Sequence, residues 1–209
     1  MTCEDGKNDQ IELLQNKIKE LEQQLLQLQK KKDKTQEIHH KNFQSVLYQA
    51  QHDQMTGFYN KQVTAEKINE LLVSDTGKYS SHVFFIIDLD YFKQVNDCFG
   101  HPFGDEVLTK TAKKIRALFR NEDILGRIGG DEFIVLMKNV LDKKIAYLKA
   151  KEICESVAEH YMQNEVEHKV TVSVGIALYD CHGHNFEELY HHSDIALYQA
   201  KEQGRNHFA

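Results

Sequence analysis

Hydrophobic residues near the start of the chain recur at a regular spacing of three and four positions. Between them stand mostly Glu, Gln and Lys, and the hydrophobic positions themselves are Ile11, Leu14, Ile18, Leu21, Leu25 and Leu28. This spacing is that of the a and d positions of a coiled coil. An amphipathic helix on the surface of a globular domain is the alternative, but its hydrophobic stripe is usually wider. The pattern therefore favours a coiled coil.

The heptad register breaks after residue 28. Continued, it would place Lys32, Thr35, His39 and Asn42 in the seam, and the stretch KKKDK at 30–34 is a run of solvated charges. Hydrophobic residues then resume at Ile38, Phe43, Val46, Leu47 and Ala50. We expect the helix to continue with a changed register. The expected division is a flexible N-terminus at 1–10, a coiled-coil helix at 11–52 and a globular domain at 53–209.

After residue 53 the pattern alternates between helical and strand periodicity. Helices are expected at about 60–74, 105–120, 142–161 and 186–203, and strands at 82–88, 122–128, 132–138 and 168–178. In this order the helices pack naturally over one mainly antiparallel sheet. The sequence therefore predicts an α+β domain preceded by a long coiled-coil helix.

Composition narrows the class of protein. A hydrophobic content of 41% is enough for one core, and the net charge of -6 argues against a general nucleic-acid-binding protein. The longest purely hydrophobic run, VFFII at 83–87, is far too short to span a membrane, and the acidic start MTCEDGKND is unlike a secretion signal. A cytoplasmic location is expected. Only four arginines occur, Arg116, Arg120, Arg127 and Arg205, and each is a candidate for gripping a phosphate or carboxylate.

Neither the cysteines nor the histidines predict a zinc site. The scattered cysteines Cys3, Cys98, Cys154 and Cys181 contain no C-x-x-C pair, so buried or incidental thiols are expected. The histidines cluster at 39–40, 182–184 and 191–192 without a four-ligand set at recognisable spacing. We expect adventitious metal binding there or none.

The segment GRIGGDEF at 126–133 concentrates carboxylates between two hydrophobic runs. Its glycines suit a tight hairpin turn that needs positive φ, but Asp131 and Glu132 need another explanation. Asp88 ends the hydrophobic strand at 82–88, and if that strand lies beside the hairpin, the three acids converge. Oxygen ligands of this kind suit Mg²⁺ or Mn²⁺. Since neighbours on a strand face opposite ways, either the turn distorts the strand or one acid has a different role. A merely polar turn is the alternative.

Four spaced motifs give the chain from about residue 52 to 206 a resemblance to the GGDEF-domain diguanylate cyclases. They are DQMTGFYN at 53–60, DLDYFKQVNDCFGHPFGDEVL at 88–108, GRIGGDEF at 126–133 and AKEQGRN at 200–206. Met55 and Phe58 stand where the family usually has leucine, and Lys61 stands where it usually has arginine. These differences affect packing and leave the chemistry in place.

The resemblance implies a ferredoxin-like fold, similar to the palm of nucleotidyl cyclases, and a defined reaction. Two GTP molecules, one per subunit of a homodimer, are condensed into cyclic di-GMP with release of pyrophosphate. Each 3′-hydroxyl attacks the α-phosphate of the other molecule, chemistry that depends on positioning and charge neutralisation. The implied cofactor is Mg²⁺ or Mn²⁺, and the coiled coil would join the two subunits.

Site residues carry over from the resemblance by position. Asp88, the Leu89 carbonyl, Glu132 and Asp131 are implied as metal ligands, and Asp131 and Glu132 as catalytic residues, with Asp131 the base for the 3′-hydroxyl. Gly130 would let the nucleotide lie against the backbone.

Recognition of GTP is implied for a second set of residues. Asn96 and Asp105 would bind guanine, whose N1–H and amino group a carboxylate can accept. An N-cap at the following helix is the alternative role for Asp105. The remaining substrate contacts implied are Phe92, Lys93, His101, Lys201 and Arg205.

The sequence Arg120-x-x-Asp123 is separated from Gly129 by five residues, the family's placement for an inhibitory site that binds cyclic di-GMP. Arg116, one helical turn earlier, would assist, and a helix-end ion pair is the alternative. Two other classes of protein are alternatives: a degenerate domain that binds nucleotide without catalysis, and a coiled-coil adaptor with an inert globular head. The activating signal is not evident from the sequence.

Overall fold

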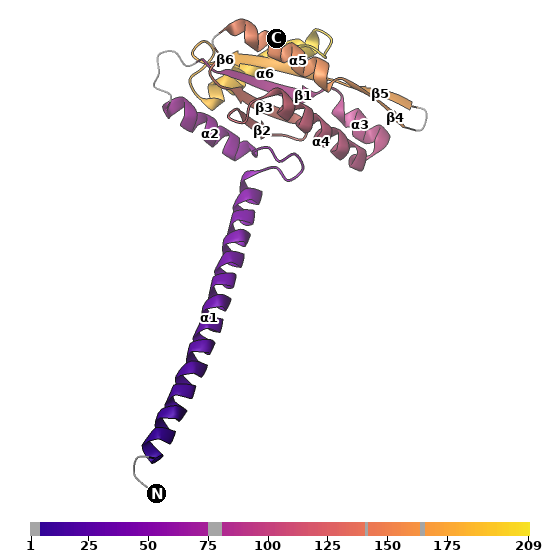
Figure 1. The fold of residues 1–209 in the computed structure, drawn as a ribbon. Helices are drawn as coiled ribbons and strands as arrows, with labels where there is room; N and C mark the ends of the chain where they lie inside the picture. The colour runs from indigo at the N-terminus through magenta and orange to yellow at the C-terminus, as the bar shows by residue number, and fades with distance from the viewer. Residues whose placement is uncertain (1–4, 75–80, 141, 164–165) are drawn as a thin grey trace. The chain divides into compact units, whose positions relative to one another are not determined.

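The computed structural model describes residues 5–74, 81–140, 142–163 and 166–209, and the chain divides into two units, residues 1–50 and 51–209 (Figure 1). The described residues of the first unit all belong to helix α1, Asp5–Gln51, which runs through the charged 30–34 stretch without a break. The expected flexible N-terminus falls partly on residues 1–4, which lie outside the described residues, and α1 already begins at Asp5.

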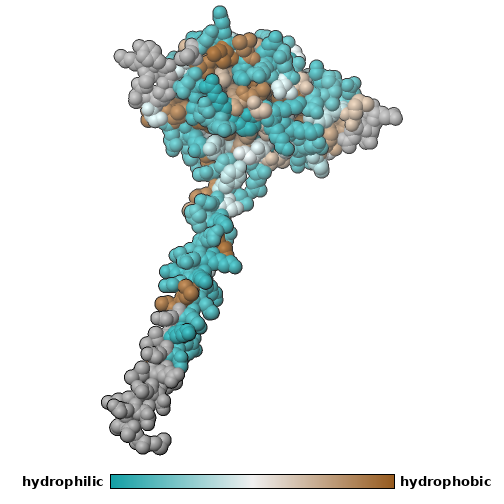
Figure 2. Space-filling view, viewed as in Figure 1, coloured by the Kyte–Doolittle hydropathy of each residue, from teal (hydrophilic) through white to brown (hydrophobic). Residues whose placement is uncertain are grey.

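The seam predicted for α1 is uncovered in the single chain. Leu14, Leu21, Leu25 and Leu28 are each 53–64% exposed, and the side chains of Ile11 and Ile18 lie outside the described residues. Figure 2 shows hydrophobic patches on the otherwise hydrophilic surface of this helix. Since exposed leucines at a and d positions are stabilised when a second helix covers them, this helix is consistent with a coiled coil.

The second unit is built on a four-stranded antiparallel sheet of order β2-β3-β1-β6. Its strands are β1 (Val83–Leu89), β2 (Ile124–Arg127), β3 (Glu132–Met137) and β6 (Val172–Leu178). The central strand β1 is buried on both faces, which explains its continuous hydrophobic run. The predicted α+β class with a mainly antiparallel sheet is confirmed.

Helices cover both faces of the sheet (Figure 1). Alternate residues of β1, beginning with Val83, pack into a cluster with α3 (Phe92–Phe99), α4 (His101–Leu118) and α5 (Lys143–Val157). The intervening residues, such as Phe84 and Ile86, pack with α2 (Lys61–Ser74) and α6 (Phe186–Glu202). Side chains one apart on β1 therefore face different layers, and Asp88 falls on the α2/α6 side.

Several elements differ from those expected. The helix α3 was not predicted, because it is short and follows Tyr91, a non-glycine residue with φ of 56°, without a side-chain cap. The strand expected at 168–178 divides into β5 (Val166–Val170) and β6, and the helix expected to reach 161 ends at Val157. Strand β4 (Glu159–Gln163) pairs with β5 as a separate two-stranded sheet.

Two local interpretations were wrong. Asp105 is not an N-cap, because α4 begins at His101 and Gly100, with φ of 84°, precedes it. Gly129 and Gly130 are not among the residues with positive φ in the described chain, and residues 128–131 separate β2 from β3. The hairpin is therefore wider than a two-residue turn and does not need glycine for its backbone angles. In the part of the chain that the structure describes, helices long and hydrophobic enough to cross a membrane are absent.

Candidate active site

Asp88 and Glu132 face each other across the centre of the sheet. The β1–β3 register pairs them directly, Ile86 with Ile134 being the next pair on the same side. Directly opposite side chains have Cβ atoms about 5 Å apart, and like charges at that distance destabilise a sheet. Burial raises the pKa of both carboxyl groups, and the mutual charge of Asp88 raises that of Glu132 further. The fold thus holds two acids where their ionisation is unfavourable without a cation.

Helix α6 supplies the partners of this acid pair. The ammonium of Lys201 lies 2.7 Å from Asp88 Oδ1, and the hydroxyl of Tyr190 donates to Glu132 Oε1 at 3.1 Å. Burial first, and the nearby Glu132 carboxylate second, raise the pKa of Tyr190 to about 12, so the hydroxyl keeps its proton. Lys201 was expected at the site from the sequence, whereas Tyr190 was not. Their separation of eleven positions, three turns on one helix face, is the signal that could have found it.

The acid pair fits a divalent cation that keeps other ligands. Among the described residues, groups of three or more His, Cys, Asp or Glu side chains able to hold a metal ion are absent. Mg²⁺ is usually held by one or two carboxylates together with water and substrate phosphates, so Asp88 and Glu132 suffice as its protein side-chain ligands. Leu89, the other predicted ligand, follows Asp88 at the end of β1, and its N–H donates to the Asp131 carbonyl at 3.2 Å.

Asp131 lies at the edge of this pair rather than within it. It is half-buried, and its charge raises the pKa of Asp88 after burial has done so. It precedes Glu132 at the start of β3, where successive side chains point to opposite faces. The structure therefore brings Asp131 near the acid pair without forming a cluster of three ligands.

Arg127 fixes the turn at residues 128–131 that carries Gly129 and Gly130. One guanidinium nitrogen, Nη2, donates to the Gly130 carbonyl at 2.6 Å, and Nη1 donates to both oxygens of Asp53 at 3.0 and 3.1 Å. Burial would raise the pKa of Asp53, but hydrogen bonds from Thr56 and Arg127 outweigh it and the pKa is lowered. Arg127 was expected from the scarcity of arginine to grip a phosphate or carboxylate, and here it binds the carboxylate of Asp53. It joins the turn after α1 to the glycine turn.

Gly130 is exposed and borders open space. A Cβ built there would meet no atom of the described chain within 4 Å. Packing within the protein therefore does not explain why glycine stands at this position, and a ligand lying against the backbone remains the prediction for it.

Asn96 and Asp105 meet at the corner between α3 and α4. A Cβ on Gly104 would come within 2.0 Å of Asn96 Oδ1, so the amide of Asn96 lies directly over Gly104, next to Asp105 in sequence. Asp105 itself is exposed. The corner follows the carboxyl end of β1, which brings it to the same end of the sheet as Asp88.

The other predicted substrate residues surround that end of the sheet. Lys93 and His101 are exposed at the corner, whereas Phe92 is 9% exposed and packs in the core. The guanidinium of Arg205 stacks over the ring of Tyr91, 4.5 Å from its centroid.

The buried Asp90 fixes this end of the molecule. Its carboxylate accepts from Thr171 Oγ1 at 2.6 Å, Ser173 Oγ at 2.7 Å and the backbone N–H of Asn206 at 3.0 Å. The second acid of the D-x-D motif therefore joins β1 to the neighbouring β6 region and to the C-terminal segment that carries Arg205.

Arg120 and Asp123 lie away from the acid pair, at the turn before β2. Asp123 is 5% exposed, and its two oxygens accept from the N–H groups of Arg120 at 2.8 Å and Lys138 at 3.0 Å. The side chain of Arg120 is exposed and lies 3.8 Å from Glu122. The interaction between Arg120 and Asp123 is therefore a backbone cap rather than the alternative helix-end ion pair.

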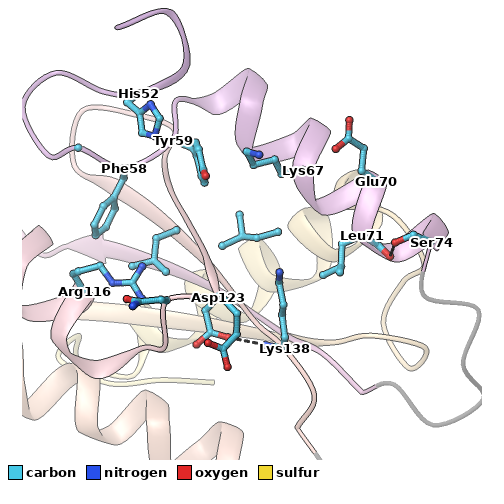
Figure 3. Close-up of a pocket in the computed structure, with 15 residues that line it drawn as sticks. His52, Phe58, Tyr59, Lys67, Glu70, Leu71, Ser74, Arg116, Asp123 and Lys138 are labelled. Atoms are coloured by element: carbon cyan, nitrogen blue, oxygen red, sulfur yellow. Dashed lines mark hydrogen bonds between the residues drawn. The ribbon is translucent and has the colours of Figure 1, made fainter. Parts of the chain in front are cut away.

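A cavity of about 580 Å³ opens beside this turn (Figure 3). Tyr59, Lys67 and Glu70 line one side, and Arg116, Asp123 and Lys138 line the other. Arg120 and Asp123 together border a neighbouring, smaller cavity of about 230 Å³. The predicted inhibitory residues thus lie at concave surface that carries lysine and arginine side chains.

Comparison with known proteins gives one consistent result. A family model described as the diguanylate cyclase GGDEF domain matches residues 50–207. The chain is 37% identical over 161 residues to the probable diguanylate cyclase DgcT of Escherichia coli, covering 75% of this chain and 35% of that protein. It is 34% identical over 161 residues to the bifunctional diguanylate cyclase/cyclic di-GMP phosphodiesterase MucR of Pseudomonas aeruginosa, covering 77% of this chain and 23% of MucR.

Comparison with solved structures gives the same family as comparison of sequences. The solved GGDEF domain of TpbB from Pseudomonas aeruginosa matches with a TM-score of 0.69 at 32% identity, covering 75% of this chain and 91% of that domain. The chain spans only 15 to 35% of the length of the curated relatives that it matches first. The likeness is therefore that of one domain.

Proposed function

The chain belongs to the GGDEF family of diguanylate cyclases, and on that premise we propose that it condenses two GTP molecules into cyclic di-GMP, releasing two pyrophosphates. The observation that carries this proposal is the Asp88–Glu132 pair, two half-buried acids of raised pKa placed opposite each other by the sheet register. Such a pair suits a divalent cation and the phosphates that the cation brings with it.

The residues around the acid pair divide the chemistry among them. Asp88 and Glu132 hold Mg²⁺ or Mn²⁺, with the carbonyl of Leu89 as a third oxygen. The cation, when bound, neutralises charge that develops on the phosphates. Asp131, at the edge of the pair, accepts the proton of the 3′-hydroxyl or shares the cation. Gly130 leaves room for the nucleotide.

Guanine recognition is assigned to the α3–α4 corner. Asp105 accepts from N1–H and the amino group of guanine, and Asn96, held over Gly104, makes a further contact. Phe92 and His101 shape this part of the site, and Lys93 approaches the triphosphate from α3.

Lys201 and Arg205 approach the triphosphate from the opposite side. Lys201 is the counter-ion of Asp88 in the structure, at 2.7 Å, and it is placed to bind phosphate when a cation takes over that role. Arg205 stacks on Tyr91, so its guanidinium is held near the end of β1.

A domain that binds nucleotide without catalysis is the competing function. Such domains typically lose an acid or glycine of the GGDEF motif, and residues 129–133 here retain every one. An inert head on a coiled-coil adaptor would not require acids of raised pKa at the register position of Asp88 and Glu132. The intact motif and this pair favour the enzyme.

Replacement of Asp131 tests the reaction. Asp131→Asn should lower the rate of cyclic di-GMP formation from Mg²⁺ and GTP by about 100-fold or more, the scale of losing a general base. Its circular dichroism should remain native, because this half-buried residue contributes little to the core. Undiminished turnover in the variant would remove Asp131 from the mechanism. Failure of the native chain to form cyclic di-GMP at any protein concentration would reject the enzyme.

Product inhibition is proposed at Arg120 and Asp123, with the arginine on phosphate and the aspartate on guanine. The support is the position of the pair, which five residues separate from Gly129, and the cavities that border it. Asp123 is held by two backbone N–H groups. The side chain of Arg120 is exposed, and its contact with Glu122 at 3.8 Å is long, so it can turn toward a phosphate. Arg116 lines the larger cavity and supplies a second guanidinium nearby.

Cyclic di-GMP added to the assay should slow the native chain and leave Arg120→Ala unaffected, because the variant lacks the phosphate contact. Glu122→Ala is the matched control, since it removes the 3.8 Å ion pair of Arg120 and keeps the guanidinium. Initial rates over a range of added cyclic di-GMP give the inhibition constant for each protein. Equal inhibition of native chain and Arg120→Ala would refute the site.

Dimerisation through α1 is proposed because one active site holds one GTP, and bond formation requires two sites to face each other. The exposed leucines of the a and d seam provide a surface for a second copy. A parallel coiled coil would convert the encounter of the two domains into an intramolecular event, with an effective concentration on the order of millimolar.

Charged residues in the seam should separate the subunits. Leu21→Lys together with Leu25→Lys should make specific activity fall steeply on dilution, because like charges are buried at d and a positions. Leu26→Lys is the matched control, since Leu26 is 52% exposed but lies outside the seam. Sedimentation and turnover are measured on the same samples. A native chain that is monomeric yet fully active at nanomolar concentration would overturn the dimeric mechanism.

A further inference from the structure

The β4–β5 hairpin forms a sheet of its own, separate from the four-stranded sheet. Its side chains alternate: His160 and Met162 are exposed, whereas Tyr161 between them is half-buried. On β5, His168 is half-buried, and the strand register places it directly opposite Tyr161. The hairpin therefore has one packed face, and Tyr161 and His168 form a cross-strand pair on it.

This pair packs on the two phenylalanines of the α3–α4 corner. The ring of Tyr161 meets that of Phe103 edge to face with centroids 5.3 Å apart. The ring of His168 meets that of Phe99 edge to face at 5.8 Å. The two phenylalanines are 4.9 Å from each other. Four rings thus form one cluster that spans the hairpin and the corner, and Figure 1 shows the hairpin extending beside α3.

Two further contacts fix the hairpin to α4. Lys114 lies 2.6 Å from Glu159, and its hydrogen bond is the main reason that the pKa of Glu159 is lowered. Lys110 lies over the ring of Tyr161 at 5.2 Å from the centroid. The hairpin is therefore attached along α4 for at least three turns, from Phe103 to Lys114.

The corner that this cluster supports is the one that carries Asn96 and Asp105. Phe99 and Phe103 stand on either side of Gly100, where α3 ends and α4 begins. The N–H of Gly100 donates to the Asn96 carbonyl at 2.8 Å, and the Asn96 amide lies over Gly104. Asp105 is exposed, so its position depends on that of α4. A change in the angle between the helices would move Asp105 relative to Asn96.

We propose that the β4–β5 hairpin is a positioning element for guanine recognition: Tyr161 and His168 hold the Phe99–Phe103 corner so that Asn96 and Asp105 converge on one base. This inference rests on the proposed function, because it takes the base bound at the corner to be guanine. Tyr161 and His168 are positioning residues that act through the two phenylalanines. The acid pair at Asp88 and Glu132 lies on the other face of the sheet and does not depend on them.

The test compares GTP with ITP, which lacks the 2-amino group of guanine. Tyr161→Ala in the full chain should weaken GTP binding about tenfold, the scale of losing one aromatic pair, and should reduce the preference for GTP over ITP. Tyr161→Phe keeps the ring and should restore both. Equilibrium dialysis of each nucleotide with Mg²⁺ measures binding without turnover. In the assay the loss should fall on KM for GTP, with kcat nearly unchanged.

Met162→Ala is the matched control, because Met162 is the next residue, is 68% exposed and faces away from the corner. His168→Ala, which removes the other ring contact, should reproduce the effect of Tyr161→Ala and serves if that variant does not fold. If both variants keep the native GTP affinity and GTP/ITP ratio, the inference is wrong. It is also wrong if kcat falls while KM and the ratio stay native. If the native chain binds GTP more tightly than ITP but forms no cyclic di-GMP, the proposed reaction is wrong and this inference still stands.

Discussion

The fold is arranged around two acids that oppose each other across a sheet. Asp88 and Glu132 occupy paired positions on β1 and β3, and burial raises the pKa of both. Like charges directly opposite each other on neighbouring strands lower the stability of a sheet. Their presence at a half-buried position makes sense when a cation and phosphates share the site, because those ligands convert the repulsion into binding energy.

Neighbouring elements can be understood by what they do for this pair. Helix α6 brings Lys201 and Tyr190 to it, one on each acid. Asp90, just after β1, binds the hydroxyl of Thr171 and so fixes the end of that strand. Arg127 fixes the glycine turn, because its guanidinium binds both the Gly130 carbonyl and the Asp53 carboxylate. Among the described residues, Lys201 is the only cationic side chain within ion-pair distance of Asp88 or Glu132. Two acids therefore share one protein cation.

Much of this could be predicted from the sequence. The VFFII run of β1 and the two hydrophobic runs on either side of the GRIGGDEF turn are local patterns. The three strands that they predict, β1, β2 and β3, lie where expected to within a residue or two. What escaped prediction depends on tertiary contacts. Strand β4 begins inside the helix that was expected to reach residue 161. The packing of Tyr161 on Phe103, a tertiary contact, explains why the chain is a strand there. Tyr190 was not predicted, because only the fold places its hydroxyl on Glu132.

The most direct test of the account is the thermal stability of Glu132→Gln with and without Mn²⁺. Glutamine keeps the volume and can still accept the Tyr190 hydrogen bond, but it removes one charge of the pair. A carboxyl group whose pKa is raised on folding lowers stability at pH values above that pKa. Without metal at neutral pH, the variant should therefore melt at the native temperature or higher. Mn²⁺ should raise the melting temperature of the native chain and leave that of the variant unchanged. A native chain insensitive to Mn²⁺, or a metal-free variant that melts well below it, would contradict the claim that this pair is built to hold a cation.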